Sequence, residues 1–464
     1  MNRLRQSVGR VGALLSSADL ADDSVVADLL AETWSRRTLD LSDLSPAEQA
    51  ELVAGRAQQL QPTAEALAER ITEAGAHGRP FVAKLGIDPT GAEVHLGHVV
   101  PMLVLSRFQR MGHQAVLIVG DMTAKIGDPS GRSDERPPLG DEEIAANLAT
   151  YRHQVAPFFD FERAQLRHNG DWLRQVTLPD IIAVTSRIPV SMPLQREDFR
   201  RRLEAGHGLS LSELLYSVVM ALDSVEIGCD VEIGGIDQFL NMQMCRKVME
   251  ICGQVPEVVV ATALIEGTDG TGAKMSKSQG NYVPLTADAD EMFGKVMSVP
   301  DRLVAPYFRA LSEWSDAELT AVDQRLAEAT AHPMDVKKLL AGEVTAAVHG
   351  VHAAMAARAQ FVARFSRRSF VDLDHVPVVA DLDATVVEVL HALGFTRTSS
   401  EARRIAAQNG LRLVVELDGA QDQLPLSVEE ALAPLGAVLQ DRIQGRRGQI
   451  FLKCGRQLAR ITAP

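Results

Sequence analysis

The sequence has few cysteines, few aromatic residues and no long apolar run. Its 464 residues include only four cysteines and 5% aromatic residues. The cysteines form no CxxC pair and have no histidine at zinc-ligand spacing, so buried free thiols are expected rather than disulfides or a metal site. They are Cys229, Cys245, Cys252 and Cys454. No stretch supplies the roughly 18 to 20 apolar residues of a membrane helix, and no signal segment opens the chain, which predicts a cytoplasmic protein.

Basic residues are also fewer than acidic residues. The chain has 61 acidic and 47 basic residues, which leaves a net charge of -14 at pH 7. Proteins that coat nucleic acid non-specifically depend on Lys and Arg to neutralise phosphates, so this class is excluded, although a local basic face is not. Apolar residues make up 46% and charged residues 23%, the ordinary range of globular proteins. The length predicts one large α/β unit with one or two smaller ones.

A strand, a helix and a second strand are predicted early in the chain. The apolar stretch Pro80–Ile87 ends in the breakers Asp-Pro-Thr-Gly, Val99–Met111 has helical spacing and stops at a glycine, and Ala115–Val119 is again apolar. This order is a βαβ unit and predicts a parallel sheet with a right-handed crossover. Two further apolar runs, Asp230–Ile233 and Glu257–Leu264, are predicted to be later strands.

The string His95-Leu96-Gly97-His98 opens the predicted helix directly after a strand. Two imidazoles at i and i+3 share one face of a helix, and the glycine between them lets a ligand approach the backbone. A helix N-terminus favours phosphate through its free N–H groups and its dipole. A polyphosphate site is therefore one interpretation, and a structural or surface histidine pair is the other.

The string Lys274-Met275-Ser276-Lys277-Ser278 lies in a glycine-rich stretch. Two ammonium groups three residues apart in a mobile loop can close over a triphosphate and stabilise the charge on departing pyrophosphate. The alternative is a solvated basic turn, but the five-residue string is too unusual for that reading to be preferred.

The two strings together, in this order, resemble the paired signatures of the class I aminoacyl-tRNA synthetases. The resemblance implies a Rossmann-type sheet that binds ATP at the carboxyl ends of its strands, activates an amino acid as its adenylate and passes it to the 3′ end of a tRNA. Intermediate strings are similar to those of the bacterial tyrosyl-tRNA synthetase family, in the branch with KMSKS. These strings are KLGIDPT (84–90), IGDPSG (126–131) and GGIDQ (234–238).

The resemblance also implies a division of the chain into domains. Residues 1–44 are expected to be an N-terminal extension, and 45–290 a Rossmann-type α/β catalytic domain with an insertion at about 130–200. Residues 291–370 are expected to be an α-helical domain that contacts the anticodon stem. Residues 381–464 are similar to the small α+β S4-like RNA-binding domain of this family. The family implies a homodimer as well.

Site residues follow from the resemblance, position by position. Cations meet phosphate and carboxylates meet an ammonium or a hydroxyl, so the residue types agree with the expected chemistry. No general base is needed, because the amino-acid carboxylate is already a nucleophile, and no metal site beyond Mg²⁺ carried by ATP is expected. The expected catalytic residues are His95, His98, Lys274 and Lys277. The expected ATP-binding residues are Gly86, Asp88, Gly97, Gly235, Asp237, Met275, Ser276 and Ser278. The expected amino-acid-binding residues are Lys84, Asp128, Tyr216, Met220, Asp223 and Gln238. The expected tRNA-binding residues are Arg397, Arg403, Arg404, Lys453 and Arg456.

The amino-acid pocket departs from the family at two positions. Met220 stands where the family has a glutamine that bonds the α-amino group, and Leu222 stands where an aromatic residue is common. Loss of one hydrogen bond to a charged group is expected to weaken binding by roughly 1.5 to 3 kcal/mol. Tyrosine ligation is the leading prediction because Asp223 is retained. The alternatives are a synthetase paralogue that activates a different or modified amino acid for a biosynthetic pathway, and a non-catalytic RNA-binding protein.

Overall fold

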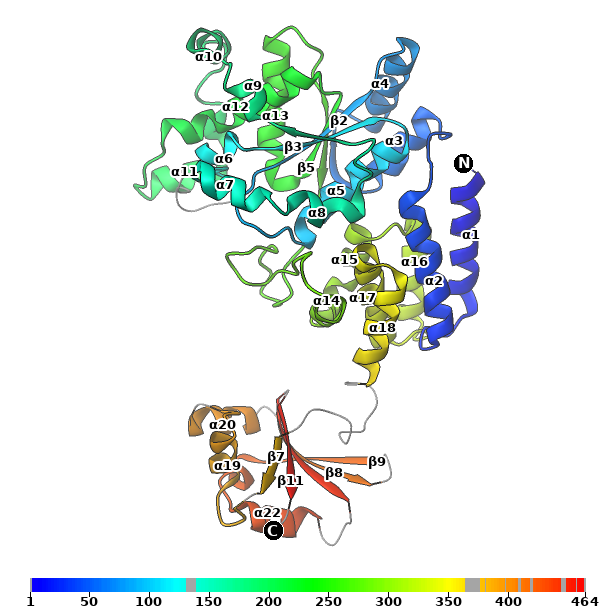
Figure 1. Ribbon diagram of the computed structural model, residues 1–464, viewed down its shortest axis with the longest axis vertical. Coiled ribbons are helices and arrows are strands. Elements are labelled where there is room, and N and C mark those ends of the chain that lie inside the picture. The colour runs from blue at the N-terminus through cyan, green and yellow to red at the C-terminus, as the bar shows by residue number, and fades with distance from the viewer. Residues whose placement is uncertain are drawn as a thin grey trace. The chain divides into compact units, whose positions relative to one another are not determined.

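The computed structural model describes nearly all of the chain and divides it into two compact units, 1–358 and 359–464 (Figure 1). None of the helices in the described ranges combines the length and the apolar character that crossing a membrane requires. The predicted domain boundaries after residues 44 and 290 both fall inside the first unit. The described ranges are 2–130, 139–363, 376–379, 381–396, 398–407, 410–417, 420–443, 448–455 and 457–462.

The first unit is built on a six-stranded sheet in the order β1-β6-β5-β2-β3-β4. Five strands are parallel, as predicted, and β1 pairs antiparallel with β6 at the edge. Because the chain runs outward from β2 on both sides, the sheet has the switch point at which open α/β sheets bind ligands. The strands are β1 (Ala57–Gln61), β2 (Val82–Ile87), β3 (Gln114–Val119), β4 (Gln165–His168), β5 (Val231–Gly235) and β6 (Val258–Thr262).

Helices cover both faces of this sheet. α5 (Leu96–Arg110) connects β2 to β3 on one face, and α13 (Phe239–Ile251) connects β5 to β6 on the other, as right-handed crossovers in opposite directions require. α12 (Leu211–Ile227) packs against α13. It begins with a capping box between Ser210 and Glu213 and ends at Gly228, whose φ of 59° suits glycine.

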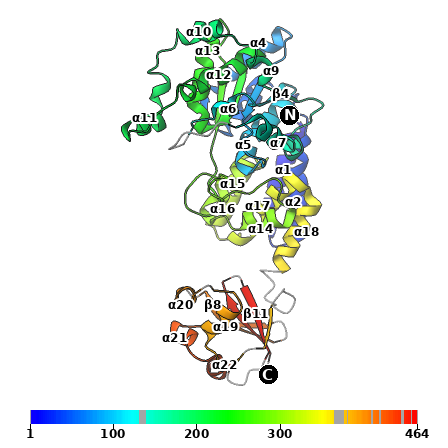
Figure 2. The same cartoon turned by 60° about the vertical axis from the view of Figure 1, so that its left-hand side comes forward.

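The insertion between β3 and α12 contributes mostly short helices. Its tip carries α10 and α11, which stand at the margin of the unit in Figure 2. The α-helices in the described part of this insertion are α6 (Thr123–Ile126), α7 (Asp141–Leu148), α8 (Tyr151–Val155), α9 (Gly170–Leu173), α10 (Leu178–Thr185) and α11 (Glu197–Glu204).

The rest of the first unit is helical. The N-terminal helices pack on this part rather than standing apart, with α1 against α16 and α2 against α17. A buried ion pair of 2.6 Å between Arg36, directly after α2, and Glu318 on α16 stabilises this packing. The helices are α1 (Asn2–Ser17), α2 (Asp23–Ser35), α3 (Pro46–Ala54), α4 (Ala64–Ala76), α14 (Ala289–Met297), α15 (Val304–Leu311), α16 (Asp316–Ala327), α17 (Pro333–His349) and α18 (Val351–Phe361).

The second unit pairs a five-stranded sheet, in the order β7-β11-β10-β8-β9, with four helices. An apolar core that includes Leu390, Ala402, Leu413, Val438 and Leu452 lies between one face of the sheet and the helices. The elements are β7 (Val376–Val379), α19 (Val386–Ala392), α20 (Ser399–Ala407), β8 (Leu411–Leu417), β9 (Ala420–Pro425), α21 (Val428–Ala431), α22 (Leu435–Ile443), β10 (Gln449–Cys454) and β11 (Gln457–Thr462).

The four cysteines are free thiols. Cys229, Cys245 and Cys454 are buried, as expected, whereas Cys252 is exposed, so the prediction is wrong for that residue. Cys252 caps the C-terminus of α13, where the chain turns toward the surface before β6.

Candidate active site

Polar residues gather where the parallel strands of the first unit end. Asp88 follows β2, Thr123 comes shortly after β3, Asn169 follows β4 and Asp237 comes shortly after β5. The carboxyl ends of parallel strands share one edge of a sheet, so residues distant in sequence meet there. Gly86 lies at the same edge, and a side chain placed on it would meet no other atom within 4 Å. The position therefore borders open space, as a ligand-binding edge requires.

His95 and His98 cap the helix that begins at this edge. The His95 Nδ1 accepts a hydrogen bond from the Gly97 N–H at 3.1 Å, and the His98 Nδ1 accepts one from the His95 N–H at 3.2 Å. Burial lowers the pKa of His95 to about 2 and that of His98 to about 4, with nearby positive charge adding to the effect. Both rings are therefore neutral near pH 7 and carry their proton on Nε2, which is left to donate to a ligand.

The structure places the lysine-containing loop beside the histidine pair. The Leu96 N–H donates to the Val283 carbonyl at 3.1 Å, so the chain just beyond the loop pairs with the start of α5. A Cβ added at Gly97 would lie 3.0 Å from the His95 ring and 3.9 Å from the Met275 Cβ. Larger residues at Gly97 would displace His95 or the loop. The two strings, far apart in sequence, thus form one surface.

The two lysines of the loop contact residues that follow two different strands of the sheet. The Lys277 ammonium donates to the Gly91 carbonyl at 3.1 Å, in the turn between β2 and α5. The Lys274 ammonium lies 2.8 Å from a carboxylate oxygen of Asp237, which follows β5. Both cations are therefore held close to the strand ends, within reach of a nucleotide bound there.

Backbone contacts fix the base of this loop. The Met275 N–H donates to the Ile265 carbonyl at 2.8 Å, and Met275 itself is buried. The Ser276 N–H donates to the buried Asn281 side chain at 2.9 Å, and the Ser276 and Ser278 hydroxyls lie 3.3 Å apart. Met275 thus anchors the loop, while Lys274 and Lys277 extend toward the site.

Asp88 is the centre of a hydrogen-bonded group at the end of β2. One of its oxygens accepts from the Thr123 hydroxyl at 2.7 Å, and the other accepts from the Tyr216 hydroxyl at 2.9 Å. Burial and then Asp88 itself raise the pKa of Tyr216 well above its usual value, so the phenol stays protonated and donates. A Cβ on Gly120 would fall on Asp88, which explains the glycine after β3.

Asp128 belongs to a second polar group between the insertion and α13. The Gln238 amide donates to it at 2.8 Å, and the Ser130 hydroxyl donates to it at 2.6 Å. Asn241, one turn along α13, bonds to both Gln238 and Ser130, at 2.8 and 3.2 Å. A half-buried carboxylate held in this way suits an ammonium group.

Asp223 lies deeper, on the face of α12 that meets the sheet. The Trp172 indole N–H donates to one of its oxygens at 2.9 Å, and the Asn169 amide donates to the other at 3.2 Å. Burial raises the pKa of Asp223 to about 7, although the nearby Lys84 opposes the shift. Asn169 also bonds to Thr123, which links this carboxyl to the group around Asp88.

Met220 is half-buried among apolar side chains. It packs against the buried cluster that includes Val218 and Met244 on α12 and α13, and against a second that includes Met242 and Val259. A thioether suits these surroundings, whereas the glutamine expected from the family would need a polar partner here.

Lys84 is buried close to Asp223, where it bonds to other residues of the core, and its assignment to amino-acid binding stays a prediction. Its side chain is only 1% exposed, forms a 2.7 Å ion pair with Glu232 and donates to Ser224 at 2.6 Å. Lys84 lies in the middle of β2, and its side chain extends toward Ser224 on α12. Glu257 lies nearby, and burial and then Glu232 raise its pKa well above the usual value, so one carboxylate balances the lysine.

The expected tRNA-binding residues that the structure describes lie on different sides of the second sheet. Arg403 and Arg404 are exposed on α20, which packs on the helical side of the second sheet. Lys453 lies between two core residues of β10, so it points to the opposite face, where it pairs across the strands with Arg412. Arg397 and Arg456 lie outside the described residues.

Several residues of the site carry no sequence signature. Asn169, Trp172 and Asn241 all bond to predicted site residues. Asn241 stands three residues after Gln238 on a helix, which is a usable signal. Asn169 directly follows a strand too polar to predict, so its place at the strand ends could not be deduced.

Comparison with known proteins identifies the family of the chain. The family model described as tRNA synthetases class I (W and Y) matches residues 76–366. The tyrosine–tRNA ligase of Thermotoga maritima is 40% identical over 79% of this chain and 89% of its own length. That of Desulfotalea psychrophila is 38% identical over 80% of this chain and 90% of its own.

Solved structures agree at the level of the fold. A C-terminally truncated mitochondrial tyrosyl-tRNA synthetase from Aspergillus nidulans is 20% identical, with a TM-score of 0.57 over 74% of this chain and 99% of that one. The Archaeoglobus fulgidus tyrosyl-tRNA synthetase, complexed with L-tyrosine, is 20% identical, with a TM-score of 0.54 over 67% of this chain and 99% of that one. The chain therefore belongs to the class I tRNA synthetases and, among these enzymes, to the tyrosine–tRNA ligase family.

Proposed function

We propose that the chain joins tyrosine to tRNA in two steps at the strand ends of its first unit. In the first, a tyrosine carboxylate oxygen attacks the α-phosphorus of ATP, a P–O bond forms, and the bond to the bridging oxygen breaks to release pyrophosphate. In the second, a terminal ribose hydroxyl of tRNA attacks the activated carbonyl and AMP leaves. The observation that carries this proposal is the contact of the histidine pair with the lysine-containing loop.

The first step needs charge stabilisation rather than an acid or a base. The histidine Nε2–H groups and the ammonium groups of Lys274 and Lys277 are hydrogen-bond donors suited to phosphate oxygens. These four groups offer nitrogen donors and no carboxylate, so Mg²⁺ is expected to arrive on the triphosphate as part of the substrate. Asp237, now beside Lys274, would bind the ribose hydroxyls.

The amino-acid end of the site offers complementary acceptors. Asp128, with Tyr216 nearby, would hold the α-ammonium group, and Gln238 would lie beside the carboxylate. Asp223 would accept the phenolic O–H of tyrosine. Met220 supplies apolar surface in place of a polar contact, which supports a pocket that still takes an aromatic side chain.

An ATP–pyrophosphate exchange assay over the standard amino acids and several tyrosine analogues tests this function. Exchange with tyrosine alone is the expected result. Exchange only with an analogue would instead support a paralogue that activates a modified amino acid, which is the reading that Met220 motivates. No exchange with any amino acid would support a non-catalytic RNA-binding protein. Addition of tRNA then tests the transfer step.

Replacement of Asp223 should erase the preference for a hydroxyl. In Asp223→Asn, kcat/KM for tyrosine should fall by roughly 10- to 150-fold, because a hydrogen bond to a charged group contributes about 1.5 to 3 kcal/mol. The value for phenylalanine, which lacks the hydroxyl, should change little. Exchange kinetics with both amino acids provide the measurement. An equal loss for both would show that Asp223 only holds Trp172 and Asn169 in place.

The pH dependence of activation should follow the titration of Asp223 and not that of His95 or His98. As pH rises through about 7, Asp223 loses its proton and becomes the stronger acceptor, so KM for tyrosine should fall. The pKa values of His95 and His98 are too low for either ring to titrate near pH 6.5. Exchange kinetics measured from pH 5.5 to 9 should therefore show KM for tyrosine falling near pH 7, while the rate at saturating tyrosine shows no inflection near pH 6.5. An inflection of that rate near pH 6.5 that remains in Asp223→Asn would contradict this assignment.

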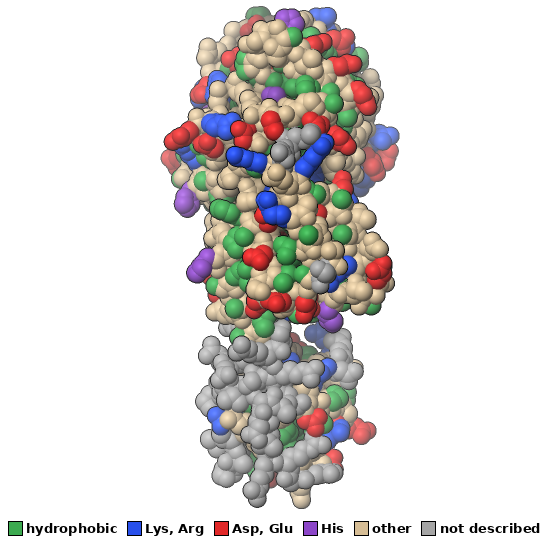
Figure 3. Space-filling view, turned by 90° about the vertical axis from the view of Figure 1, so that its right-hand side faces the viewer, with side chains coloured by type: hydrophobic (Ala, Val, Ile, Leu, Met, Phe, Trp, Pro, Cys, Tyr) green, Lys and Arg blue, Asp and Glu red, His purple; other side chains and the backbone are tan. Residues whose placement is uncertain are grey.

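Binding of tRNA is proposed for both units. Arg403, Arg404 and Lys453 supply positive charge in the second unit, whereas on the face of the first unit in Figure 3 basic and acidic side chains are interspersed. Recognition by shape and a few local contacts fits this better than a broad basic surface. Loss of charging in Arg403→Ala/Arg404→Ala with intact pyrophosphate exchange would support the assignment; unchanged charging would contradict it.

A homodimer in the cytoplasm is proposed as the working form. The insertion exposes large apolar side chains, among them Leu178 (71% exposed), Ile182 (55%) and Val190 (63%). Such a group on a protein surface marks a contact with another protein, and a second copy is the occupant that the family implies. A monomeric mass in sedimentation velocity at micromolar concentration would contradict the dimer.

A further inference from the structure

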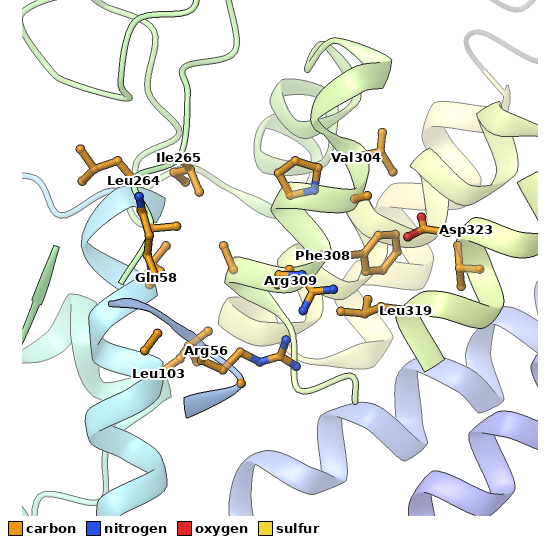
Figure 4. Close-up of a pocket in the computed structure, with 18 of the residues that line it drawn as sticks. Arg56, Gln58, Leu103, Leu264, Ile265, Val304, Phe308, Arg309, Leu319 and Asp323 are labelled. Carbon is orange, nitrogen blue, oxygen red and sulfur yellow. The ribbon is translucent and has the colours of Figure 1, made fainter. Parts of the chain in front are cut away.

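A cavity of about 480 Å³ lies in the first unit, and its lining includes none of the predicted site residues (Figure 4). It is enclosed by α5, the start of β1, the segment 263–265 after β6, and helices α15 to α17. Its volume is within the range of about 300 to 1,000 Å³ that is typical of small-molecule sites. Because Arg309 and Ala305 line it and are exposed, the cavity opens to the surface.

Most of the cavity wall is apolar. α5 contributes Leu103 and Val104, α15 contributes Phe308, and α16 contributes Leu319. Leu264 lines it as well and is 41% exposed, although it lies next to a buried strand. An exposed leucine on the wall of a cavity of this size indicates that apolar ligand surface can be buried there.

One part of the wall is positively charged. Arg56, Arg107 and Arg309 line the cavity together with Asp323. Two carboxylates outside the lining also bind these arginines: Glu313 pairs with Arg107, and Asp316 pairs with Arg309. In Figure 4 the side chains of Arg56 and Arg309 reach toward the same part of the cavity, and their charges act on each other. Burial, and then Arg107, lowers the pKa of Arg56 to about 10, although Glu313 and Asp316 oppose the shift, so the guanidinium remains charged.

Two of these guanidinium groups are buried and incompletely bonded. The side chains of Arg56 and Arg107 are 10% and 2% exposed, and the Nη1 of each has no hydrogen-bond partner among the described residues. The nearest carboxylate to Arg56 Nη1 belongs to Asp316, at 3.6 Å, which is beyond hydrogen-bond distance, and Asp316 lies 2.6 Å from Arg309. A buried N–H without a partner costs about 1 to 3 kcal/mol, which a ligand acceptor would recover.

We propose that this cavity binds a small carboxylic acid with an apolar body of roughly 10 to 15 non-hydrogen atoms. The carboxylate would lie beside the guanidinium groups of Arg56 and Arg309, which reach toward the same part of the cavity, and the apolar body would lie against Leu103, Leu264 and Phe308. A carboxylate matches guanidinium geometry because it can accept two N–H groups at once. An inorganic anion would satisfy the charge but leave the apolar wall uncovered. The proposal does not depend on the proposed ligase activity.

Calorimetric titration of the full-length protein with octanoate and with octan-1-ol tests this site. The two probes share an apolar chain and differ in charge. Octanoate is expected to bind one molecule per chain and at least about tenfold more tightly than octanol, since a charge-assisted hydrogen bond is lost with the alcohol. Equal affinities, or binding of inorganic phosphate as tight as that of octanoate, would overturn the proposal.

Variants of lining residues place the probe in this cavity. Arg56→Gln should reduce octanoate affinity at least about tenfold and leave octanol unchanged. Ala310→Phe, which extends a larger side chain from the half-buried Ala310 into the cavity, should abolish both. Asp323→Asn removes the lining carboxylate and should strengthen octanoate binding. Thermal unfolding verifies that each variant is folded. Octanoate binding that all three leave unchanged would show that it occurs elsewhere and would overturn the proposal.

Discussion

Replacement of Lys277 by alanine should slow tyrosyl-adenylate formation by about 10²- to 10³-fold, with little change in KM for tyrosine. Loss of one preorganised donor to a developing negative charge has about this cost in other enzymes. The charge develops on pyrophosphate as it departs, so the interaction is stronger in the transition state than in the ground state. Rapid-quench measurement of adenylate formation at saturating ATP and tyrosine gives this rate directly.

Two further variants make the result specific. Lys247→Ala removes a lysine of α13 that pairs with Glu250 on the surface, and it should leave the rate unchanged. Lys277→Arg keeps the charge and should recover part of the lost rate. A loss in Lys277→Ala that appears only as a higher KM for tyrosine would indicate a different role for the loop, as would an equal loss in Lys247→Ala.

Replacement of Glu313 by glutamine should lower the free energy of unfolding by about 3 to 5 kcal/mol. Loss of one partner of a buried ion pair leaves uncompensated charge, and losses of this size are typical. Glu313 is 8% exposed and lies 2.9 Å from Arg110 and 3.3 Å from Arg107. These arginines belong to α5, the helix that begins with the histidine pair, so the cluster joins the catalytic sheet to the helical part. Urea unfolding of the two proteins provides the comparison.

The same cluster predicts a pH dependence of stability. Burial acts to raise the pKa of Glu313, but Arg107 and then Arg110 outweigh it and hold the pKa well below its usual range. A lowered native pKa means that the unfolded chain binds more protons below about pH 4.5, so this stabilisation is present above that pH and is lost as pH falls. Glu313→Gln should show a smaller loss of stability between pH 5 and pH 3. The exposed Glu204→Gln is a matched control, and a loss below about 1 kcal/mol in Glu313→Gln would contradict the ion-pair role.

The sequence predicts the centre of the sheet better than its edges. β2, β3 and β6 are mostly buried and mostly apolar, so their strands are recognisable without neighbours. β1 (AQQLQ) and β4 (QLRH) are polar because they lie at the edges of the sheet, and nothing in their composition separates them from loops. The packing of the N-terminal helices was also beyond prediction, since it depends on Arg36 reaching Glu318.

The sequence likewise predicts some residues of the site and not others. The histidine and lysine strings are predictable because they are rare in combination, and the structure places them together. Lys84 lies in a signature string as well, but a motif gives residue identity without the direction of the side chain. Its place in the middle of β2 directs it under α12 to Glu232. Partners such as Trp172 depend on tertiary contacts that a single sequence does not contain.

The most direct measurement is a crystal structure with tyrosine and α,β-methylene ATP, in which a carbon replaces the bridging oxygen of the bond that breaks. Lys277 Nζ and His98 Nε2 should each lie about 2.7 to 3.2 Å from phosphate oxygens of the same nucleotide. A nucleotide bound at the strand ends with Lys277 still on the Gly91 carbonyl, or a nucleotide bound away from both residues, would contradict the proposed site.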